Sequence, residues 1–359
     1  MIALGAFISL LFIPGIPSPA VTPRWAALSM VIPLLWLFKD MRPGGTQVVL
    51  WLALLGYGVL LPMPDPYTGT NALWLLMLGA GFAWLMQEGD FRRFMIGLGC
   101  GAIVNAAVTV AQVYGWAGLP QTYVPGGLFM NKNPNGEFAA LLLVGFVGWR
   151  LWWLVPAPLI TLVLSGSKAS MLGVAAAAVF LSRAWLLAGA AIIVLAGTAY
   201  PMFEGHFSHL VERTVVWRDL MGNLTLYGNG LGSYMARAPV FEGTTYIYAH
   251  NDWLQLVFEL GIGVLPLVAL IILAFRFEGC RVEKAVLVTF AVEACFGFPS
   301  HFPVTLLVAC GGLGAVLESR ARLRAHERAS QHLLRHGYAG SRRHFGSPAF
   351  GAGRRGVSV

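Results

Sequence analysis

Long apolar stretches separated by short polar segments recur along the whole chain. Each stretch approaches the about 20 residues that a helix needs to cross the hydrocarbon core of a membrane. The pattern therefore predicts an all-α, polytopic integral membrane protein with about twelve transmembrane helices. The expected spans are 2–16, 25–38, 46–61, 70–87, 94–117, 136–152, 154–166, 169–182, 184–200, 253–275, 285–298 and 303–318.

The composition supports this prediction and excludes a soluble globular domain. Hydrophobic residues make up 57% of the 359 residues, charged residues make up 11%, and the mean hydropathy is +0.69. The four cysteines lie in or near apolar stretches without paired spacing, so we expect neither disulfides nor metal ligands from them. The net charge of +8 comes largely from basic residues beside the spans, so no nucleic-acid partner is expected.

The basic residues predict the orientation of the chain in the membrane. With a cytoplasmic N-terminus, eighteen Lys and Arg residues lie inside and six lie outside, as the positive-inside rule requires. Both termini are then cytoplasmic, and every polar cluster that could carry chemistry lies on the opposite face. ATP and nucleotide-sugars are not available there, so an enzyme on that face needs a donor that arrives already activated, such as a lipid-linked one.

Three regions follow from the spacing of these stretches. Residues 1–318 form a multi-span membrane domain, within which 201–252 is a large outside loop. An amphipathic helix is expected between Glu204 and Met221, on the membrane surface. The basic tail 319–359 has little apolar periodicity, and we expect it to be disordered and close to anionic lipid headgroups.

Two outside segments before this loop contain candidate binding residues. Asn131 and Asn135 precede an expected span, where their amides and the helix N-terminus could face a polar or anionic ligand, or could simply cap the helix. Lys168 lies at a tight turn between two short spans. It either extends its ammonium group to the membrane boundary or faces a diphosphate. No Gly-x-Ser-x-Gly elbow supports a serine hydrolase.

The large loop combines cations with a glycine-rich turn. Arg213 and Arg218 could bind phosphate oxygens, because a guanidinium is bidentate and always charged, or they could be solvated charges. They are five residues apart, about 140° round a helix, so they do not point the same way. The turn 228–233 contains three glycines and could expose N–H groups to an anion, or be a plain loop.

The loop ends at His250, directly before an expected span. A histidine, whose pKa is ordinarily about 6.5, can take a proton from a sugar hydroxyl, although a lone His is also common as a structural residue at the interface. Asn251 beside it is a candidate substrate contact. His206, His209 and His301 also lie outside, but few carboxylates and no cysteines accompany them, so no metal site is expected.

Several motifs in chain order, over roughly residues 95–315, resemble the O-antigen ligase and polymerase superfamily. The motifs are Gly127-Leu128-Phe129-x-Asn131-x-Asn133-x-Asn135, Ser165-Gly-Ser-Lys168-Ala-Ser, Arg213-x-x-x-Trp217, Gly228-x-Gly230-x-Gly232 and His250-Asn251-Asp252-x-Leu254 followed by Glu259-x-Gly261-x-Gly263. The His-Asn-x-x-Leu and Glu-x-Gly-x-Gly part is the most specific of them.

This resemblance implies an inverting, metal-independent class C glycosyltransferase of the cell inner membrane, with a large periplasmic loop and no cofactor. Such enzymes transfer a glycan from an undecaprenyl-diphosphate carrier to lipid A core, a growing polysaccharide or a protein. The resemblance assigns His250 as the base and Arg213 as a diphosphate ligand. Lys168 stands where many members have Arg, and Arg218 has no firm counterpart.

We favour an O-antigen ligase, with a polysaccharide polymerase and a protein O-glycosyltransferase as alternatives in the same superfamily. A transporter is the alternative from a different class. Ionisable residues inside spans and broken helices would indicate it, and Glu293 and Pro266 fit those criteria.

Overall fold

The computed structural model describes residues 1–16, 18–39, 44–181, 208–237, 240–241 and 244–341. The chain divides into two compact units, Met1–Ser319 and Arg320–Val359. The first unit contains the predicted membrane domain and every candidate site residue. Its described part is almost entirely helical, apart from two-residue strands β1 (Val240–Phe241) and β2 (Thr244–Thr245), which pair antiparallel.

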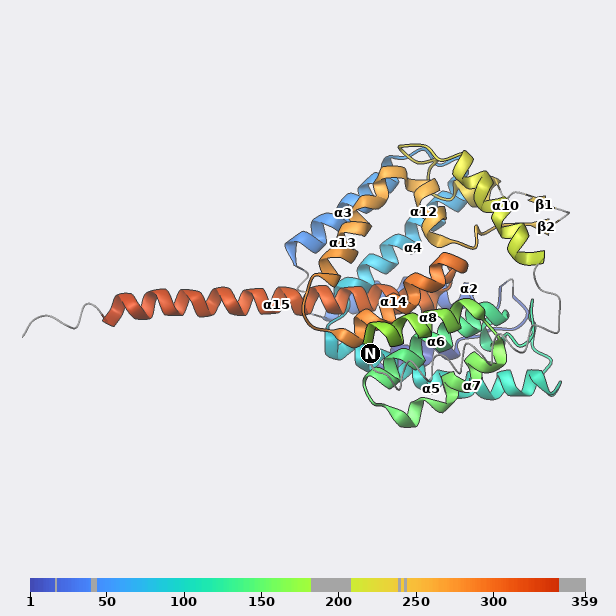
Figure 1. Cartoon of the computed structure of the whole chain (residues 1–359), viewed down its shortest axis with the longest axis horizontal. Helices are drawn as coiled ribbons and strands as arrows, with labels where there is room; N and C mark the ends of the chain where they lie inside the picture. Colours follow the sequence, from blue (N-terminus) through green and yellow to red (C-terminus); the bar gives the residue numbers. More distant parts are fainter. Residues whose placement is uncertain (17, 40–43, 182–207, 238–239, 242–243, 342–359) are drawn as a thin grey trace, which may run out of the picture. The chain divides into compact units, whose positions relative to one another are not determined.

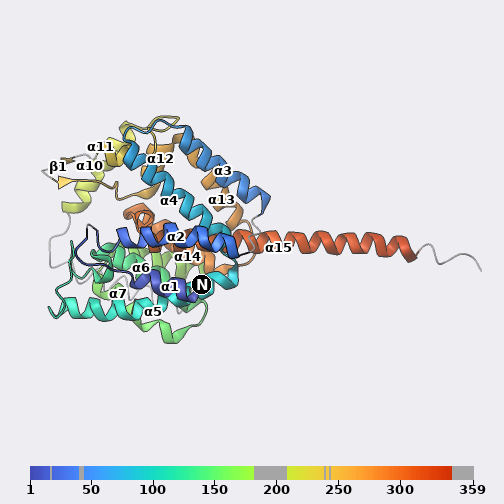
Figure 2. The same ribbon diagram turned by 180° about the vertical axis from the view of Figure 1, so that it is seen from behind.

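The N-terminal helices pack closely where glycines face each other. The helices are α1 (Ile2–Leu10), α2 (Thr22–Phe38), α3 (Gly45–Leu60), α4 (Pro66–Leu85) and α5 (Glu88–Val113). Helix α1 lies along α5 (Figure 2). A Cβ on Gly97 would lie 2.1 Å from the Ile2 carbonyl oxygen, and one on Gly5 would lie 2.3 Å from that of Phe94. Small residues that allow such backbone contact are typical of helix packing in membranes.

The middle of the chain forms the most buried helix. The elements are η1 (Gly127–Phe129), α6 (Lys132–Gly148), η2 (Trp152–Leu154), α7 (Pro156–Ser165) and α8 (Lys168–Leu181). Every residue of α6 from Pro134 to Phe146 is buried. It contacts α7, α8 and a later helix, α14, around it (Figure 1). The apolar α6 is therefore the centre of this part of the core.

The C-terminal half contains the helix of the large loop and the last apolar helices. The elements are α10 (Ser208–Gly222), α11 (Ser233–Arg237), α12 (Asp252–Leu260), η4 (Gly261–Val264), α13 (Leu265–Phe275), α14 (Arg281–Phe296), η5 (Pro299–His301) and α15 (Pro303–Ser341). Helix α10 lies within the segment where a helix was expected before Met221, of which residues 204–207 lie outside the described residues; its place on the membrane surface stays a prediction. The expected span 253–275 is helical at both ends and broken at η4, because Gly261 adopts a φ of +54° and Pro266 lies in the first turn of α13.

Three helical segments of the described chain are long and apolar enough to cross a membrane: Glu88–Val113, Asp252–Phe275 and Pro303–Ala325. Shorter apolar helices of 10–17 residues lie at Thr22–Phe38, Gly45–Leu60, Trp152–Ser165 and Lys168–Leu181. The expected span 184–200 lies outside the described residues. These helices support membrane association, while the number of crossings stays a prediction.

The start of the tail is helical, not disordered as expected. Helix α15 continues to Ser341, and residues 342–359 lie outside the described part. The sequence from Arg320 to Ser341 is rich in Arg, Ala and Leu, which are strong helix formers. Local helix propensity explains the difference, because the helix formers are concentrated at the start of the tail, whereas its composition as a whole, rich in Arg, His, Gly and Ser, indicates disorder.

Candidate functional site

Helix α10 is attached to two other segments by side chains one helical turn apart. Nη1 of Arg213 donates to the carbonyl oxygen of Phe296, at the end of α14, at 2.8 Å. Nε1 of Trp217 donates to the carbonyl oxygen of Ala249, at 2.8 Å. Residues four apart lie on one face of a helix, so the Arg-x-x-x-Trp spacing lets one face of α10 hold both segments.

His250 lies between two fixed residues and has a strained backbone. Its φ is +53°, a left-handed conformation that non-glycine residues seldom adopt. The half-buried ring packs edge-on against Phe298, with ring centroids 4.8 Å apart. Asn251 follows as the N-cap of α12, where its Oδ1 accepts from the Leu254 N–H at 2.9 Å. Strain of this kind persists only where the surroundings determine the conformation.

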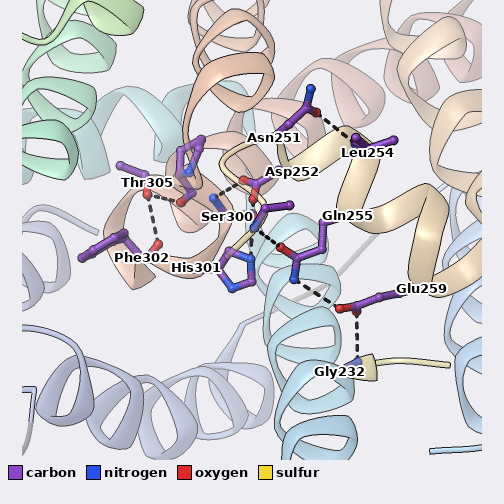
Figure 3. A network of polar contacts seen from close by, with 12 residues as sticks. Gly232, Asn251, Asp252, Leu254, Gln255, Glu259, Ser300, His301, Phe302 and Thr305 are labelled. Atoms are coloured by element: carbon purple, nitrogen blue, oxygen red, sulfur yellow. Dashed lines mark hydrogen bonds and ion pairs between the residues drawn. The ribbon is translucent and has the colours of Figure 1, made fainter. Parts of the chain in front are cut away.

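A stripe of buried polar residues on α12 reaches the neighbouring loops (Figure 3). Asp252, Gln255 and Glu259 are spaced i, i+3 and i+7, so they lie along one face of the helix. Asp252 accepts from the Ser300 N–H at 2.8 Å, and its Oδ1 lies 3.5 Å from Nε2 of His301. The stripe thus links the start of α12 to η5.

The glycine-rich turn binds this stripe, so its N–H groups are used within the protein. Gly232 donates to the Glu259 carboxylate at 3.0 Å, and Gly230 donates to the Glu259 carbonyl oxygen at 2.9 Å. A Cβ on Gly230, whose φ is +94°, would lie 1.8 Å from the Pro62 carbonyl oxygen. The glycines therefore permit close backbone packing, and the anion that the turn contacts is a carboxylate of the chain itself.

The candidate asparagines have structural partners. Asn131 is the N-cap of α6 and accepts from the Asn133 N–H at 3.0 Å. Asn135 is fully buried and accepts from Asn105 at 2.7 Å, while its own amide donates to Thr109 at 3.1 Å. The cap at Asn131 corresponds to the helix-start alternative that the sequence left open, and burial leaves Asn135 inaccessible to a substrate.

Replacing Asn135 by Ala is expected to reduce stability. The change leaves the Asn105 and Thr109 partners without one hydrogen bond each, at a cost of about 1–3 kcal/mol for each buried group. We expect a clear fall in the melting temperature of the purified protein in detergent. Asn131→Asp, which keeps a capping oxygen, should melt within a few degrees of the wild type. Equal melting temperatures for Asn135→Ala and the wild type would contradict a structural role.

The remaining candidate cations differ in their surroundings. Lys168 is exposed at the first position of α8. The turn before it packs on the start of α6, where a Cβ on Gly136 would lie 2.7 Å from Oγ of Ser165. Arg218 is exposed, whereas Arg213 on the same helix is half-buried. The structure thus brings the turn of Lys168 to α6, and it brings Arg213 but not Arg218 against the end of α14.

Two buried carboxyl groups, one of them close to the carbonyl that Arg213 contacts, were not among the predicted site residues. Glu137 on α6 and Glu293 on α14 are 1% and 0% exposed. A Cβ on Gly297 would lie 2.3 Å from Oε1 of Glu137, and the preceding carbonyl, that of Phe296, accepts from Arg213. An ionisable residue inside an apolar helix is itself a sequence signal for function. That signal was used for Glu293 only as an indication of transport, and not at all for Glu137.

The acidic and histidine residues do not form a recognisable metal site. Within the described residues, no group of three or more His, Cys, Asp or Glu side chains is arranged to hold a metal ion. An imidazole can transfer a proton and a guanidinium can bind an anion; His250 precedes α12 and packs on Phe298, and Arg213 contacts the Phe296 carbonyl at the end of α14.

Comparison with known proteins does not assign the chain to a family. No protein-family model matches the chain, and no curated protein sequence matches it significantly. The resemblance noted above therefore depends on the motifs and on where their residues lie.

Proposed function

We propose that the protein is a glycosyltransferase that moves a glycan from undecaprenyl diphosphate to an acceptor hydroxyl at the periplasmic face of the cell inner membrane, as an O-antigen ligase. The attachment of α10 to the Phe296 and Ala249 carbonyls supports this proposal best. Through it, one helix face brings the Arg213 guanidinium to the end of α14 and also fixes the segment that carries His250. A cation and a base are the two groups that this reaction requires.

In the proposed reaction, the acceptor oxygen attacks the anomeric carbon of the donor sugar. His250 takes the proton of the acceptor hydroxyl as the new carbon–oxygen bond forms. The bond between the anomeric carbon and the phosphate oxygen breaks, and its electron pair leaves with the lipid diphosphate. Arg213 stabilises the negative charge that grows on this leaving group, and in-line attack inverts the anomeric configuration.

Helices α6 and α8 begin close together, since a Cβ on Gly136 would lie 2.5 Å from the Cβ of Ser167, and the dipole of a helix N-terminus favours negative charge. In α6 and α12, one N–H group of the first turn is already used by the Asn131 and Asn251 caps. In the proposed topology, about twelve spans of a class C fold surround the polyprenyl chain of the donor, and both termini are cytoplasmic. Lys168, at the start of α8, is the second cation proposed for the diphosphate.

A test of this function is to incubate the purified protein with an undecaprenyl-diphosphate glycan and three acceptors: lipid A core, a free glycan and a protein. We expect the lipid A core to gain the mass of the glycan. Mass gain by the free glycan or the protein alone would instead indicate the polymerase or the protein O-glycosyltransferase. A protein that transfers to none of them under conditions where it is folded contradicts the proposal.

A transporter is favoured by one observation, the pair of carboxyl groups at Glu137 and Glu293 inside apolar helices. Uptake of a solute into liposomes that contain the protein and no lipid-linked donor would support this second function. We expect no such uptake, because the titratable residues near Arg213 and His250 lie at the ends of the helices.

The pH dependence of transfer should distinguish His250 from His301. Burial lowers the pKa of His301 to about 4, so this ring is neutral and able to accept a proton at any higher pH. If His301 were the base, acidification would protonate it and stop transfer only near pH 4. We expect His301→Asn to leave the pH dependence of transfer unchanged. If the transfer rate of the wild type falls with a midpoint near pH 4, His301 is the base in place of His250.

A further inference from the structure

The peptide groups next to His250 are held from two directions. The carbonyl oxygen of Ala249 accepts from Nε1 of Trp217 at 2.8 Å, and the Ala249 N–H donates to Oε1 of Gln255 at 3.2 Å. Ala249 itself is fully buried. Its backbone therefore has little freedom, and the left-handed φ of His250 follows directly after it.

Gln255 is fixed in turn by Glu259. Its Nε2 donates to Oε1 of Glu259 at 3.2 Å, while Oε2 of Glu259 accepts from the Gly232 N–H at 3.0 Å (Figure 3). A carboxylate only accepts hydrogen bonds, so the amide nitrogen of Gln255 must face Glu259 and its oxygen must face Ala249. Gly232, Glu259 and Gln255 thus form a chain of hydrogen bonds, called the relay below, that runs from the glycine turn to the backbone before His250.

We propose that Gln255 and Glu259 are positioning residues for His250. This inference rests on the proposed function, because it gives the relay a purpose in the transfer reaction. An apolar pair would fill the same buried space without the cost of burying an acid and an amide, which are 4% and 5% exposed. What an apolar pair lacks is the directional contact that sets the backbone at Ala249 and therefore the direction of the imidazole.

Exchanging the two side-chain types tests the relay. Gln255→Glu places a second carboxyl group against Glu259, so the two groups repel or compete for one proton, and the relay loses the amide donor. In the double variant Gln255→Glu with Glu259→Gln, the amide at 259 can donate to the carboxylate at 255. Ala249 then still donates to an oxygen at 255, and Gly232 to an oxygen at 259. All hydrogen bonds of the relay are then restored. Only the one between the side chains at 255 and 259 has its donor and acceptor exchanged.

Two measurements report on the position and accessibility of the His250 imidazole. One is the rate at which diethyl pyrocarbonate modifies His250, read by mass spectrometry of the peptide, which needs no glycan donor. The other is kcat for glycan transfer. In Gln255→Glu we expect modification to rise at least about threefold as the segment opens locally, and kcat to fall about 10–100-fold as the base is misplaced. In the double variant, both should return most of the way to wild-type values.

The matched control is Gln47→Glu, which adds the same charge at another buried glutamine, on α3. It should leave the His250 modification rate unchanged even if it lowers the melting temperature. If Gln255→Glu does not fold, Gln255→Leu removes the contact to the Ala249 N–H without adding a charge and should raise His250 modification in the same direction.

Wild-type values for folded Gln255→Glu or Gln255→Leu, or a folded double variant no better than the single one, would overturn the positioning role. If the wild type transfers no glycan but the modification pattern holds, the proposed function fails and the positioning role stands. If the wild type transfers glycan but the double variant is not rescued, the proposed function stands and the positioning role fails.

Discussion

Replacing His250 by Ala is expected to lower glycan transfer by at least about 100-fold, because a positioned general base contributes roughly 10²–10⁴ to the rate. The protein should still fold, since the half-buried ring packs at the edge of the aromatic cluster around Phe298 and is not part of the relay on α12. The measurement is kcat with saturating lipid-linked donor, beside the melting temperature of the same preparation.

A second variant at this position separates the loss of the base from damage to the turn. The φ of +53° at His250 is unfavourable for Ala, whereas Asn adopts left-handed conformations more readily. His250→Asn should therefore keep the backbone and still lack a base for the acceptor. Both variants should be inactive. Normal transfer by either one, in a folded protein, would exclude His250 as the base.

Replacing Arg213 by Ala is expected to reduce kcat by about 100-fold, the loss seen when one preorganised donor to a developing negative charge is removed. Arg213→Lys should lie between Ala and the wild type. Lysine keeps the charge, but it cannot bind two phosphate oxygens side by side or reproduce the planar contact to the Phe296 carbonyl. Single-turnover transfer from the lipid-linked donor measures the effect on the chemical step.

Arg218→Ala provides the comparison on the same helix. Arg218 is exposed and points away from the face that holds Phe296 and Ala249, so its removal should cost much less than that of Arg213. A fully active Arg213→Lys would argue against a bidentate contact with the diphosphate. Equal losses in Arg213→Ala and Arg218→Ala would indicate that both act only through the general positive charge of the loop.

The helices could be located from the sequence because apolar runs and their polar boundaries are local features. The helix of the large loop was predicted from a partial apolar stripe, and the structure has a helix there from Ser208 to Gly222. The break at Gly261 was harder to predict, since it depends on the close approach of the Leu226 and Tyr227 backbone, 35 and 34 residues earlier in the chain. The helical start of the tail was missed because propensity, without periodicity, determines it.

The candidate site was predictable only as separate pieces. The motifs singled out Arg213, Trp217 and His250, but the bond from Trp217 to Ala249 joins residues 32 apart and could not be read from local spacing. For Asn131 and Asn251, a capping role and a ligand contact require the same residue type at the same helix position, so the sequence could not choose between them. Their backbone partners in the structure are those of helix caps.

The glycine turn has a consequence for engineering this protein. Gly230 lies against the Pro62 backbone, and Gly232 against that of Thr68 and the Glu259 carboxylate, so both sides of the turn are occupied by the chain. An inserted residue has no space there and would also break the relay to His250. We expect insertion libraries to lose function at 228–232 and to retain it more often near the short β1–β2 pair, which has only two residue pairs to disrupt. Insertions are therefore better placed beside β1 and β2, with the glycine turn kept constant.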